Sequence, residues 1–517
     1  MPTALTLSQL VARLSGAALT GSGEHVITGL THDSRHVQPG CLFICLQGAN
    51  FDGHKYAADA LAKGAAAVVV TNDGLEKAGV VLPSDSTVVT VADTRAALPL
   101  LACAFHGDPS HSMRMVGVTG TNGKTTTTRM IAAILRADGK KVGVIGTLGS
   151  ELEGVPIESD HTTPEADQLQ AVLAEMRDRG ADAVVMEVSS HALAQRRTDG
   201  IAFNVGVFTN LTQDHLDYHE TMDQYFAAKA RLFAEYPVRF PRQDKSMFTS
   251  VVNVGQWEGQ ELVTLARGDI LTFTTTENPA TLRAENIVLA PDSATFVLEH
   301  DSGISRWKQP ITLPIGGAFQ VGNALGAIGA ALRLGVDKEV IAKGLAQMPP
   351  VPGRFEAVPT GDLGFSVIVD YAHSPDGLDN LLRSAHELHP TRILCVFGCG
   401  GDRDRRKRPI MGGIAARQAD IAIVTSDNPR HEQPQAIIDE IMTGMDKNAD
   451  PTLHAEIHVE PDRRAAIALA IGLARPGDLV LIAGKGHEDY QIIGDTKHHF
   501  DDREITKELM ERLEKSV

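Results

Sequence analysis

From about Val116 onward, short β-branched runs alternate with glycine-rich or polar segments and then with apolar positions at helical spacing. Short buried runs separated by crossover helices are typical of a parallel sheet with helices on both faces. The fold class that this pattern predicts is therefore α/β. It places strands within segments 114–119, 141–146, 181–188, 202–209, 365–370, 391–398, 419–425 and 477–484.

Breaks in the pattern indicate the domain organisation. "MPPVPGRFE", residues 348–356, concentrates proline and glycine and is typical of a linker. Residues 28–71 form a smaller α/β pattern with a helix and a buried strand of their own. Residues 236–315 alternate polar and apolar positions, which predicts an antiparallel excursion of the middle domain. The simplest partition has three domains, at 1–108, 109–349 and 350–517.

Composition narrows the class of protein. Hydrophobic residues at 43% and charged residues at 22% are ordinary for a globular chain. A net charge of -17 argues against a general surface for nucleic acid or membrane. The five thinly spread cysteines fit a reducing compartment, and the N-terminus shows neither a secretion signal nor an apolar run of membrane length. We therefore expect a cytoplasmic protein with no membrane span and no nucleic-acid partner.

The stretch "VGVTGTNGKTTTTRM", residues 116–130, carries the densest chemical signal. It reads as a strand, a glycine turn and the start of a helix, so that backbone N–H groups surround a polyphosphate. Lys124 would then reach the distal phosphates and Thr125 a Mg²⁺ ion. The spacing departs from the strict G-x-x-x-x-G-K-(S/T) pattern, because five residues separate Gly117 from Gly123 and Gly120 supplies the turn. A glycine-rich turn without a ligand is the alternative.

Polar residues follow the neighbouring strands, at the edge where open parallel sheets bind ligands. Glu187 ends one strand, where a carboxylate either holds Mg²⁺ or caps the following helix. Asn210 and His215 follow the next strand, although an isolated histidine is more often structural. Lys229 has only the spacing of an ordinary solvated lysine, on a predicted helix with apolar positions at Tyr225, Phe226, Leu232 and Phe233.

Ten segments together resemble the Mur ligase family, ATP-dependent enzymes that form the amide bonds of the bacterial cell-wall peptide. The resemblance covers the whole chain. It implies a central P-loop parallel-sheet ATPase domain, flanked by a smaller N-terminal α/β domain and a C-terminal Rossmann-like α/β domain. The segments are "TGTNGKTT", "MEVSSHAL", "TNLTQDHLDYH", "AAKARLF", "GNALGAIGA", "PGRFE", "VDYAHSPDGL", "GCGGDRDRRKRP", "SDNPR" and "AGKGHEDYQ".

The resemblance also implies cofactors and catalytic residues. ATP and Mg²⁺ are expected, with Lys124, Glu187, His215 and Lys229 as the catalytic group. Lys229 matches the family lysine that reacts with CO₂ to become a carbamate. The metal ligands would be Thr125, Glu187, His215 and Lys229. The nucleotide would be bound by Gly120, Thr121, Asn122, Gly123, Lys124, Thr125, Thr126, Asn210, Asn323, Arg354 and Asp370.

Within the family, "DSR", "HTTPE", "DNPR" and "GKGHEDYQ" are similar to the members that add the third residue of the peptide. The substrates implied are a UDP-N-acetylmuramoyl dipeptide and meso-diaminopimelate, acted on by a monomer. The dipeptide would meet His32, Ser34, the segment 49–51, Thr162, Thr163, Ser189, Gln195 and Arg197. The amino acid would meet Arg403, Asp427, Asn428, Pro429, Arg430, Gly484 and Glu488.

Three alternatives stay open from the sequence. The amine is L-lysine rather than meso-diaminopimelate if Arg430 is merely solvated after an Asn-Pro turn. A P-loop switch or motor would hydrolyse ATP without making a bond, and would give no role to Lys229. Relatives such as folylpolyglutamate or cyanophycin synthetases would lack the sugar-nucleotide domain or have a different one.

Overall fold

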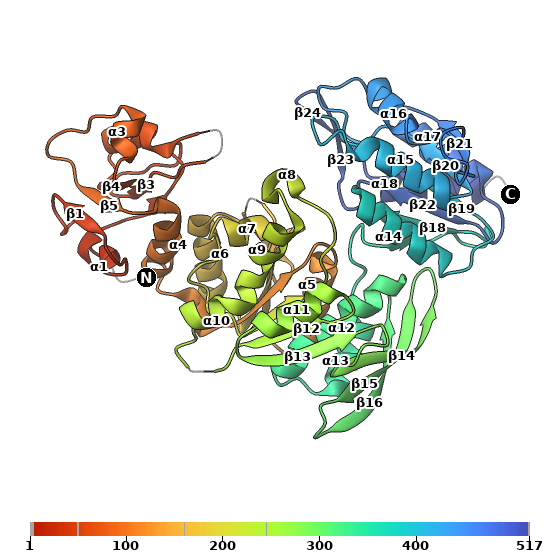
Figure 1. Ribbon diagram of the computed structural model, residues 1–517, viewed down its shortest axis with the longest axis horizontal. Coiled ribbons are helices and arrows are strands. Elements are labelled where there is room, and N and C mark those ends of the chain that lie inside the picture. The colour runs from red at the N-terminus through yellow and green to blue at the C-terminus, as the bar shows by residue number, and fades with distance from the viewer. Residues whose placement is uncertain (1–4, 49–50, 160, 245, 515–517) are drawn as a thin grey trace.

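The computed structural model describes residues 5–48, 51–159, 161–244 and 246–514. It contains three large sheets, each within one of the three predicted ranges. Figure 1 shows the N-terminal domain in red and orange and the C-terminal domain in blue, on either side of the central domain. The predicted three-domain α/β fold is confirmed, while the boundaries near residues 108 and 349 remain a prediction. No helix in these described ranges is long and apolar enough to cross a membrane.

The N-terminal domain is built on a five-stranded sheet with the order β1-β5-β4-β3-β2. Only β1 runs antiparallel to its neighbour. Its strands are β1 Ala18–Thr20, β2 Leu30–Thr31, β3 Leu42–Ile44, β4 Ala67–Thr71 and β5 Val88–Val91. Its helices are α1 Leu7–Val11, η1 Gly53–Tyr56, α2 Ala57–Ala62, α3 Gly74–Ala78 and α4 Thr94–Phe105.

The central domain holds an 11-stranded sheet with the order β16-β15-β14-β13-β12-β11-β6-β10-β7-β8-β9. Strands β6, β7, β10, β11, β12 and β13 are parallel to one another. The strands are β6 Arg114–Thr119, β7 Val142–Gly146, β8 Gly149–Leu152, β9 Val155–Ile157, β10 Ala183–Glu187, β11 Val205–Phe208, β12 Thr249–Asn253, β13 Asp269–Thr274, β14 Leu282–Leu289, β15 Ala294–Asp301 and β16 Arg306–Leu313. The helices are η2 Pro109–Ser112, α5 Lys124–Ala137, α6 Ala166–Asp178, α7 Ser190–Ala194, α8 Leu216–His219, α9 Met222–Ala234, α10 Tyr236–Arg239, α11 Trp257–Leu265, α12 Ala318–Arg333 and α13 Lys338–Ala346.

The C-terminal domain has a six-stranded sheet with the order β17-β18-β22-β19-β20-β21, in which only β17 is antiparallel. A separate two-stranded hairpin, β23–β24, lies outside this sheet. The strands are β17 Glu356–Val358, β18 Ser366–Asp370, β19 Ile393–Phe397, β20 Ile421–Val424, β21 Glu456–Val459, β22 Leu479–Ala483, β23 Tyr490–Ile493 and β24 Thr496–His499. The helices are α14 Pro375–His386, α15 Lys407–Gln418, α16 Pro434–Met442, α17 Arg463–Leu473 and α18 Asp502–Glu514.

Helices cover both faces of the central sheet. Residues of α5, α12 and α13 form one apolar core with one face, and residues of α6, α9 and α11 form a second core with the other. Because these strands are buried on both faces, they appear in sequence as continuous apolar runs. All eight strands predicted from such runs are present, four in the central sheet and four in the C-terminal sheet. The predicted site residues follow the carboxyl ends of β6, β10 and β11, at one edge of this sheet.

The predicted antiparallel excursion at 236–315 is correct only in its second half. Strands β14, β15 and β16 are antiparallel, as the alternation indicated. Strands β12 and β13 instead run parallel to β11 and extend the central sheet. The helix α11 between β12 and β13 explains this, because a crossover helix returns the chain in the same direction.

Candidate active site

The glycine-rich loop lies where β6 ends and α5 begins. Gly123 stands at the N-cap with φ 83°, a left-handed conformation that glycine adopts without strain. A side chain there would also collide with the amide oxygen of Asn323, on α12. The loop therefore needs glycine at this position both for its backbone conformation and for the close approach of α12.

Asn210, just after β11, fixes the shape of the loop. The Asn122 N–H donates to Asn210 Oδ1 at 2.9 Å, and Asn210 Nδ2 donates back to the Asn122 carbonyl at 3.2 Å. The Thr121 N–H donates to the Asn210 carbonyl at 3.0 Å. The structure thus brings both residues to the predicted nucleotide loop, where Asn210 holds the backbone by hydrogen bonds and Asn323 packs against Gly123.

Two lysines share the loop carbonyls. Lys124 Nζ donates to the carbonyls of Gly120 at 2.9 Å and Thr121 at 2.6 Å. Lys229 Nζ donates to the same Gly120 carbonyl at 2.8 Å, and its side chain is 1% exposed. In the described part of the chain neither lysine has a carboxylate within ion-pair distance. Burial, with the charge of Lys124 close by, holds the pKa of Lys229 well below its usual value, which favours a neutral amine.

Glu187 ends β10 with a buried carboxylate. Its two oxygens accept hydrogen bonds from the backbone N–H of Thr147 at 2.9 Å and from the Thr147 hydroxyl at 3.1 Å. No basic side chain forms an ion pair with it among the residues that the structure describes. Burial lowers the pKa of Lys124, and the nearby Glu187 charge opposes this shift. A buried anion beside the phosphate loop is therefore available for a cation.

His215 follows β11 in a left-handed conformation, with φ 54°. Its ring lies 4.8 Å from the ring of His191, and its Nε2 is 3.6 Å from the Asp214 carboxylate. Burial lowers the pKa of His215 to about 4 even though Asp214 opposes the shift. The imidazole is therefore neutral near pH 7, which is the form that binds a metal.

The C-terminal domain reaches the loop through a residue that the sequence did not single out. Asp376 Oδ2, at the start of α14, accepts hydrogen bonds from Asn122 Nδ2 at 2.6 Å and from the Thr212 hydroxyl at 2.7 Å. Arg354 Nη2 donates to the Thr125 hydroxyl at 3.4 Å. The partners lie far apart in sequence, so only the folded chain shows that they meet.

Asp370 has a different environment from the other predicted nucleotide residues. Its carboxylate accepts the backbone N–H of Phe355 at 2.7 Å and of Ala372 at 2.8 Å. Burial raises its pKa, against the opposing effect of Arg354. In this structure Asp370 ties the interdomain linker to the end of β18, and contact with ATP remains a prediction.

A second group of predicted residues lies in the central domain, beside the ion pair in which Glu165 meets Arg95 of the N-terminal domain at 3.4 Å. Arg197 Nη1 donates to the Thr163 carbonyl at 3.0 Å, its Nε lies 3.0 Å from Glu165, and its Nη2 donates to Gln195 Oε1 at 2.7 Å. Thr163 Oγ1 donates to the Glu187 carbonyl at 2.9 Å, which joins this group to the loop. Two further members are close by, with Thr162 against Thr147 and Ser189 capping α7. Ser34 lies in the N-terminal domain, where its carbonyl accepts from Lys63 Nζ at 2.7 Å, and its contact with substrate remains a prediction.

His32 connects the N-terminal domain to α6. Its Nδ1 lies 2.7 Å from Asp167 Oδ2, and its backbone N–H donates to the same oxygen at 3.2 Å. Burial lowers the pKa of His32, but Asp167, Glu165 and Asp33 together shift it above its usual value. The structure thus places His32 in an interdomain contact, and its contact with substrate remains a prediction. Ala49 and Asn50 of the predicted segment 49–51 lie outside the described residues.

We expect His32→Ala to destabilise the protein by about 1 to 3 kcal/mol at pH 6, because the buried Asp167 carboxylate would lose its imidazole partner and keep only the backbone N–H of residue 32. The folded-state pKa of His32 is raised, so the stabilisation is fully present below the unfolded pKa of ~6.5 and is lost as pH rises through the folded value. Chemical unfolding at pH 6 and pH 9 measures the difference. His36→Ala, 69% exposed, is the control. An equal loss at both pH values would contradict the ion pair.

The third group gathers after β20 and β22. Asn428 Nδ2 donates to Glu488 at 2.8 Å, and its Oδ1 accepts from Lys485 at 3.1 Å. Asp427 Oδ2 is buried and has no partner among the described residues, and it faces the open backbone of Gly484. Arg430 Nη1 donates to the Gly401 carbonyl at 2.8 Å, and Arg430 forms no ion pair with any described residue. The other predicted members are Arg403, which is exposed, and Pro429, which is buried.

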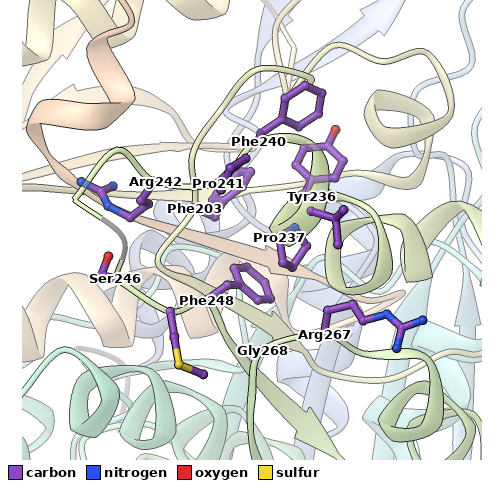
Figure 2. A pocket seen from close by; sticks show the side chains of 12 residues that line it. Phe203, Tyr236, Pro237, Phe240, Pro241, Arg242, Ser246, Phe248, Arg267 and Gly268 are labelled. Carbon is purple, nitrogen blue, oxygen red and sulfur yellow. The ribbon is translucent and has the colours of Figure 1, made fainter.

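A cavity of about 480 Å³ lies away from all three groups. Its lining residues Phe203, Phe248 and Gly268 directly precede β11, β12 and β13 or lie close to their starts, at the sheet edge opposite the loop. Figure 2 shows aromatic rings between Arg242 and Arg267, whose guanidinium groups point away from the rings. Arg242 is itself bound to backbone carbonyls. No predicted site residue lines this cavity, so it is not the candidate active site.

Together, the phosphate loop at a parallel-sheet edge and the flanking domains define a P-loop nucleotide-binding protein of the α/β class. Three family profiles match it: "Mur ligase family, catalytic domain" over 26–106, "Mur ligase middle domain" over 118–331 and "Mur ligase, glutamate ligase domain" over 353–486. The chain belongs to the Mur ligase family.

Relatives named UDP-N-acetylmuramoyl-L-alanyl-D-glutamate--2,6-diaminopimelate ligase match nearly the whole chain. The relative from Syntrophomonas wolfei is 45% identical, over 98% of this chain and 99% of that protein. The one from Geobacillus thermodenitrificans is 43% identical, over 97% of this chain and 99% of that protein. A solved structure of a ligase with this name is 31% identical, with a TM-score of 0.69, and covers 99% of this chain and 100% of that one.

Proposed function

We propose that this protein uses ATP to join meso-diaminopimelate to UDP-N-acetylmuramoyl-L-alanyl-D-glutamate in peptidoglycan precursor synthesis. The observation that carries the proposal is the pair of groups at 427–430. Asp427 offers a buried oxygen without a partner, and Arg430 a guanidinium without an acidic partner among the described residues. The Asp427 oxygen matches an ammonium group of meso-diaminopimelate, and the Arg430 guanidinium matches the distant carboxylate of the same molecule. Sequence identities of 45% and 43%, over nearly the whole chain, to relatives named as diaminopimelate ligases support the same reaction. The cytoplasmic location and the monomeric state stay predictions.

The chemistry needs an activated carboxylate, because a carboxylate and an amine do not condense usefully in water. The glutamyl γ-carboxylate attacks the γ-phosphorus of ATP, so that an O–P bond forms and ADP leaves with the electrons of the broken bond. The amine then attacks the acyl carbon, and phosphate leaves as the amine loses a proton. Lys124, on the loop, stabilises the charge that develops on the transferred phosphoryl group.

The residues around the loop fit a Mg²⁺ ion. Glu187 supplies a buried carboxylate without a basic partner in the described chain, Thr125 a hydroxyl and His215 a neutral imidazole. Such a set, completed by substrate phosphates, is typical of a Mg²⁺ site. When bound, Mg²⁺ would offset negative charge on the phosphates.

Lys229 fits the carbamate that the family resemblance implies. Its neutral amine nitrogen would attack the carbon of CO₂, forming a C–N bond while one C=O π bond passes its electrons to oxygen, and the nitrogen would release one proton. The product is an anion in place of a neutral amine. The new negative charge would lie beside the Lys124 ammonium, because the nitrogens of Lys229 and Lys124 donate to the same carbonyl. The carbamate also adds an oxygen donor next to the Mg²⁺ ligands.

Phosphate release by the purified protein tests the function. With ATP and the UDP-muramoyl dipeptide, we expect fast release when meso-diaminopimelate is added, and little with L-lysine or without an amine. The acyl phosphate is protected from water until the amine arrives, which explains the requirement. Rapid release without any amine would favour the P-loop switch, and equal rates with both amines would favour a ligase of broader choice.

A further inference from the structure

Strand β23 of the β23–β24 hairpin and the turn after it form hydrogen bonds with segment 427–430, which is proposed to bind the amine. Gln491 Nε2 donates to the Asp427 carbonyl at 2.7 Å, and the Ile492 N–H donates to Asn428 Oδ1 at 2.9 Å. The Arg430 N–H donates to the Ile492 carbonyl at 3.0 Å. The Gly494 N–H donates to the Arg430 carbonyl at 2.8 Å. The hairpin lies outside the six-stranded sheet, so these bonds are not part of the main ladder.

The same bonds hold Arg430 in an unusual backbone conformation. Its φ is 50°, in the left-handed region that is unfavourable for a residue with a side chain. The N–H and the carbonyl of Arg430 are both taken by the hairpin, in a bridge between Arg430 and Ile493. The side chain is then directed so that Nη1 reaches the Gly401 carbonyl. Without the hairpin, Arg430 would relax toward a conformation that moves its guanidinium.

The Asp427 end of the segment is equally dependent on the hairpin. Gln491 forms the bond that holds the Asp427 carbonyl, and Asp427 Oδ2 has no partner of its own. A buried carboxylate oxygen keeps its position only through the backbone that carries it. The side chain of His498, on β24 and opposite Gln491, is exposed and has no hydrogen bond with any described residue. The two strands therefore differ, because β23 and the turn at Gly494 form hydrogen bonds with the segment, whereas the described residues of β24 form none with it.

We propose that the β23–β24 hairpin determines the choice of amine by bracing residues 427–430, and that Gln491 is its main positioning residue. This inference rests on the proposed function. Gln491 does not touch the amine; it holds Asp427 where the ammonium binds, while the strand backbone holds Arg430 where the distant carboxylate binds. The residues predicted to bind ATP and the UDP-linked dipeptide lie in other segments, so the brace is expected to act on the amine alone.

Steady-state kinetics of Gln491→Leu and Gln491→Glu test the brace. Both variants keep most of the side-chain volume and remove the donor. We expect the KM for meso-diaminopimelate to rise about five- to tenfold, as loss of one hydrogen bond suggests, and the preference over L-lysine to fall by a similar factor. The KM values for ATP and the dipeptide should change less than about twofold. His498→Ala is the matched control and should behave like the unmodified protein.

The outcomes separate this inference from the proposed function. If the unmodified protein does not use meso-diaminopimelate, the function itself is wrong. If it does, but both Gln491 variants keep the original KM and amine preference, only the brace is wrong. Equal increases in the KM of all three substrates would also overturn it, because a general loss of structure would then explain the result. A selective rise for the amine in either variant supports the brace.

Discussion

Lys229→Ala is expected to reduce turnover by about 10²- to 10³-fold, the size of effect seen when one partner of a buried charge cluster is removed. The lysine is 1% exposed, and its Nζ donates a hydrogen bond to the Gly120 carbonyl of the phosphate loop. Its removal takes away the proposed carbamate and leaves Thr125, Glu187 and His215 as the proposed protein ligands of Mg²⁺. Single-turnover formation of ADP from ATP and the dipeptide measures the loss, because this step precedes the amine.

Two further variants distinguish an anion at position 229 from a cation. Lys229→Arg keeps a positive charge but forms no carbamate, so it should be as inactive as Lys229→Ala. Short carboxylates such as formate or acetate should restore part of the activity of Lys229→Ala, since they supply an anion to the emptied space. The same carboxylates should not rescue Lys124→Ala, because Lys124 acts as a cation. Near-normal activity of Lys229→Arg would overturn the carbamate.

The burial of Lys229 was within reach of the sequence, although its spacing was interpreted as that of a solvated residue. On α9, Lys229 lies four residues after Tyr225 and four before Phe233, and both of those residues are buried. Positions four apart share one helix face, so a lysine between two core aromatics belongs to the core face. A charged residue on an apolar face is the pattern that should have indicated a functional lysine.

Other features could not be predicted, because they depend on how distant segments meet. Asp376 appears in sequence only as an acidic residue in the first turn of α14, a position that the helix dipole alone explains. Its contacts with Asn122 and Thr212 follow from the docking of one domain on another. The eight predicted strands in the central and C-terminal sheets were easier, because each is a local apolar run. The hairpin was missed for the opposite reason, since β23 is only half-buried, β24 is exposed, and neither strand is a buried apolar run.

Arg430→Ala is expected to lower kcat/KM for meso-diaminopimelate by about 10²-fold or more, the cost of leaving the distant carboxylate without its charged partner. Arg430 forms no ion pair with the described protein residues, and its Nη1 is held by the Gly401 carbonyl. A planar guanidinium binds a carboxylate through two parallel hydrogen bonds. Arg430→Lys keeps the charge but not this geometry, so it should also lose most of the activity. Steady-state rates at varied amine concentration measure both variants.

The preference for meso-diaminopimelate over L-lysine follows from the contact between Arg430 and the distant carboxylate. L-Lysine lacks the second carboxylate, so in the unmodified protein it would leave the Arg430 charge unpaired and be rejected by a similar factor. In Arg430→Ala that penalty disappears, and the trace activity with L-lysine should change far less than the activity with meso-diaminopimelate. Arg406→Ala, 79% exposed in the same domain, is the control and should keep the original preference. An Arg430→Ala variant that still strongly prefers meso-diaminopimelate would mean that another residue binds the distant carboxylate.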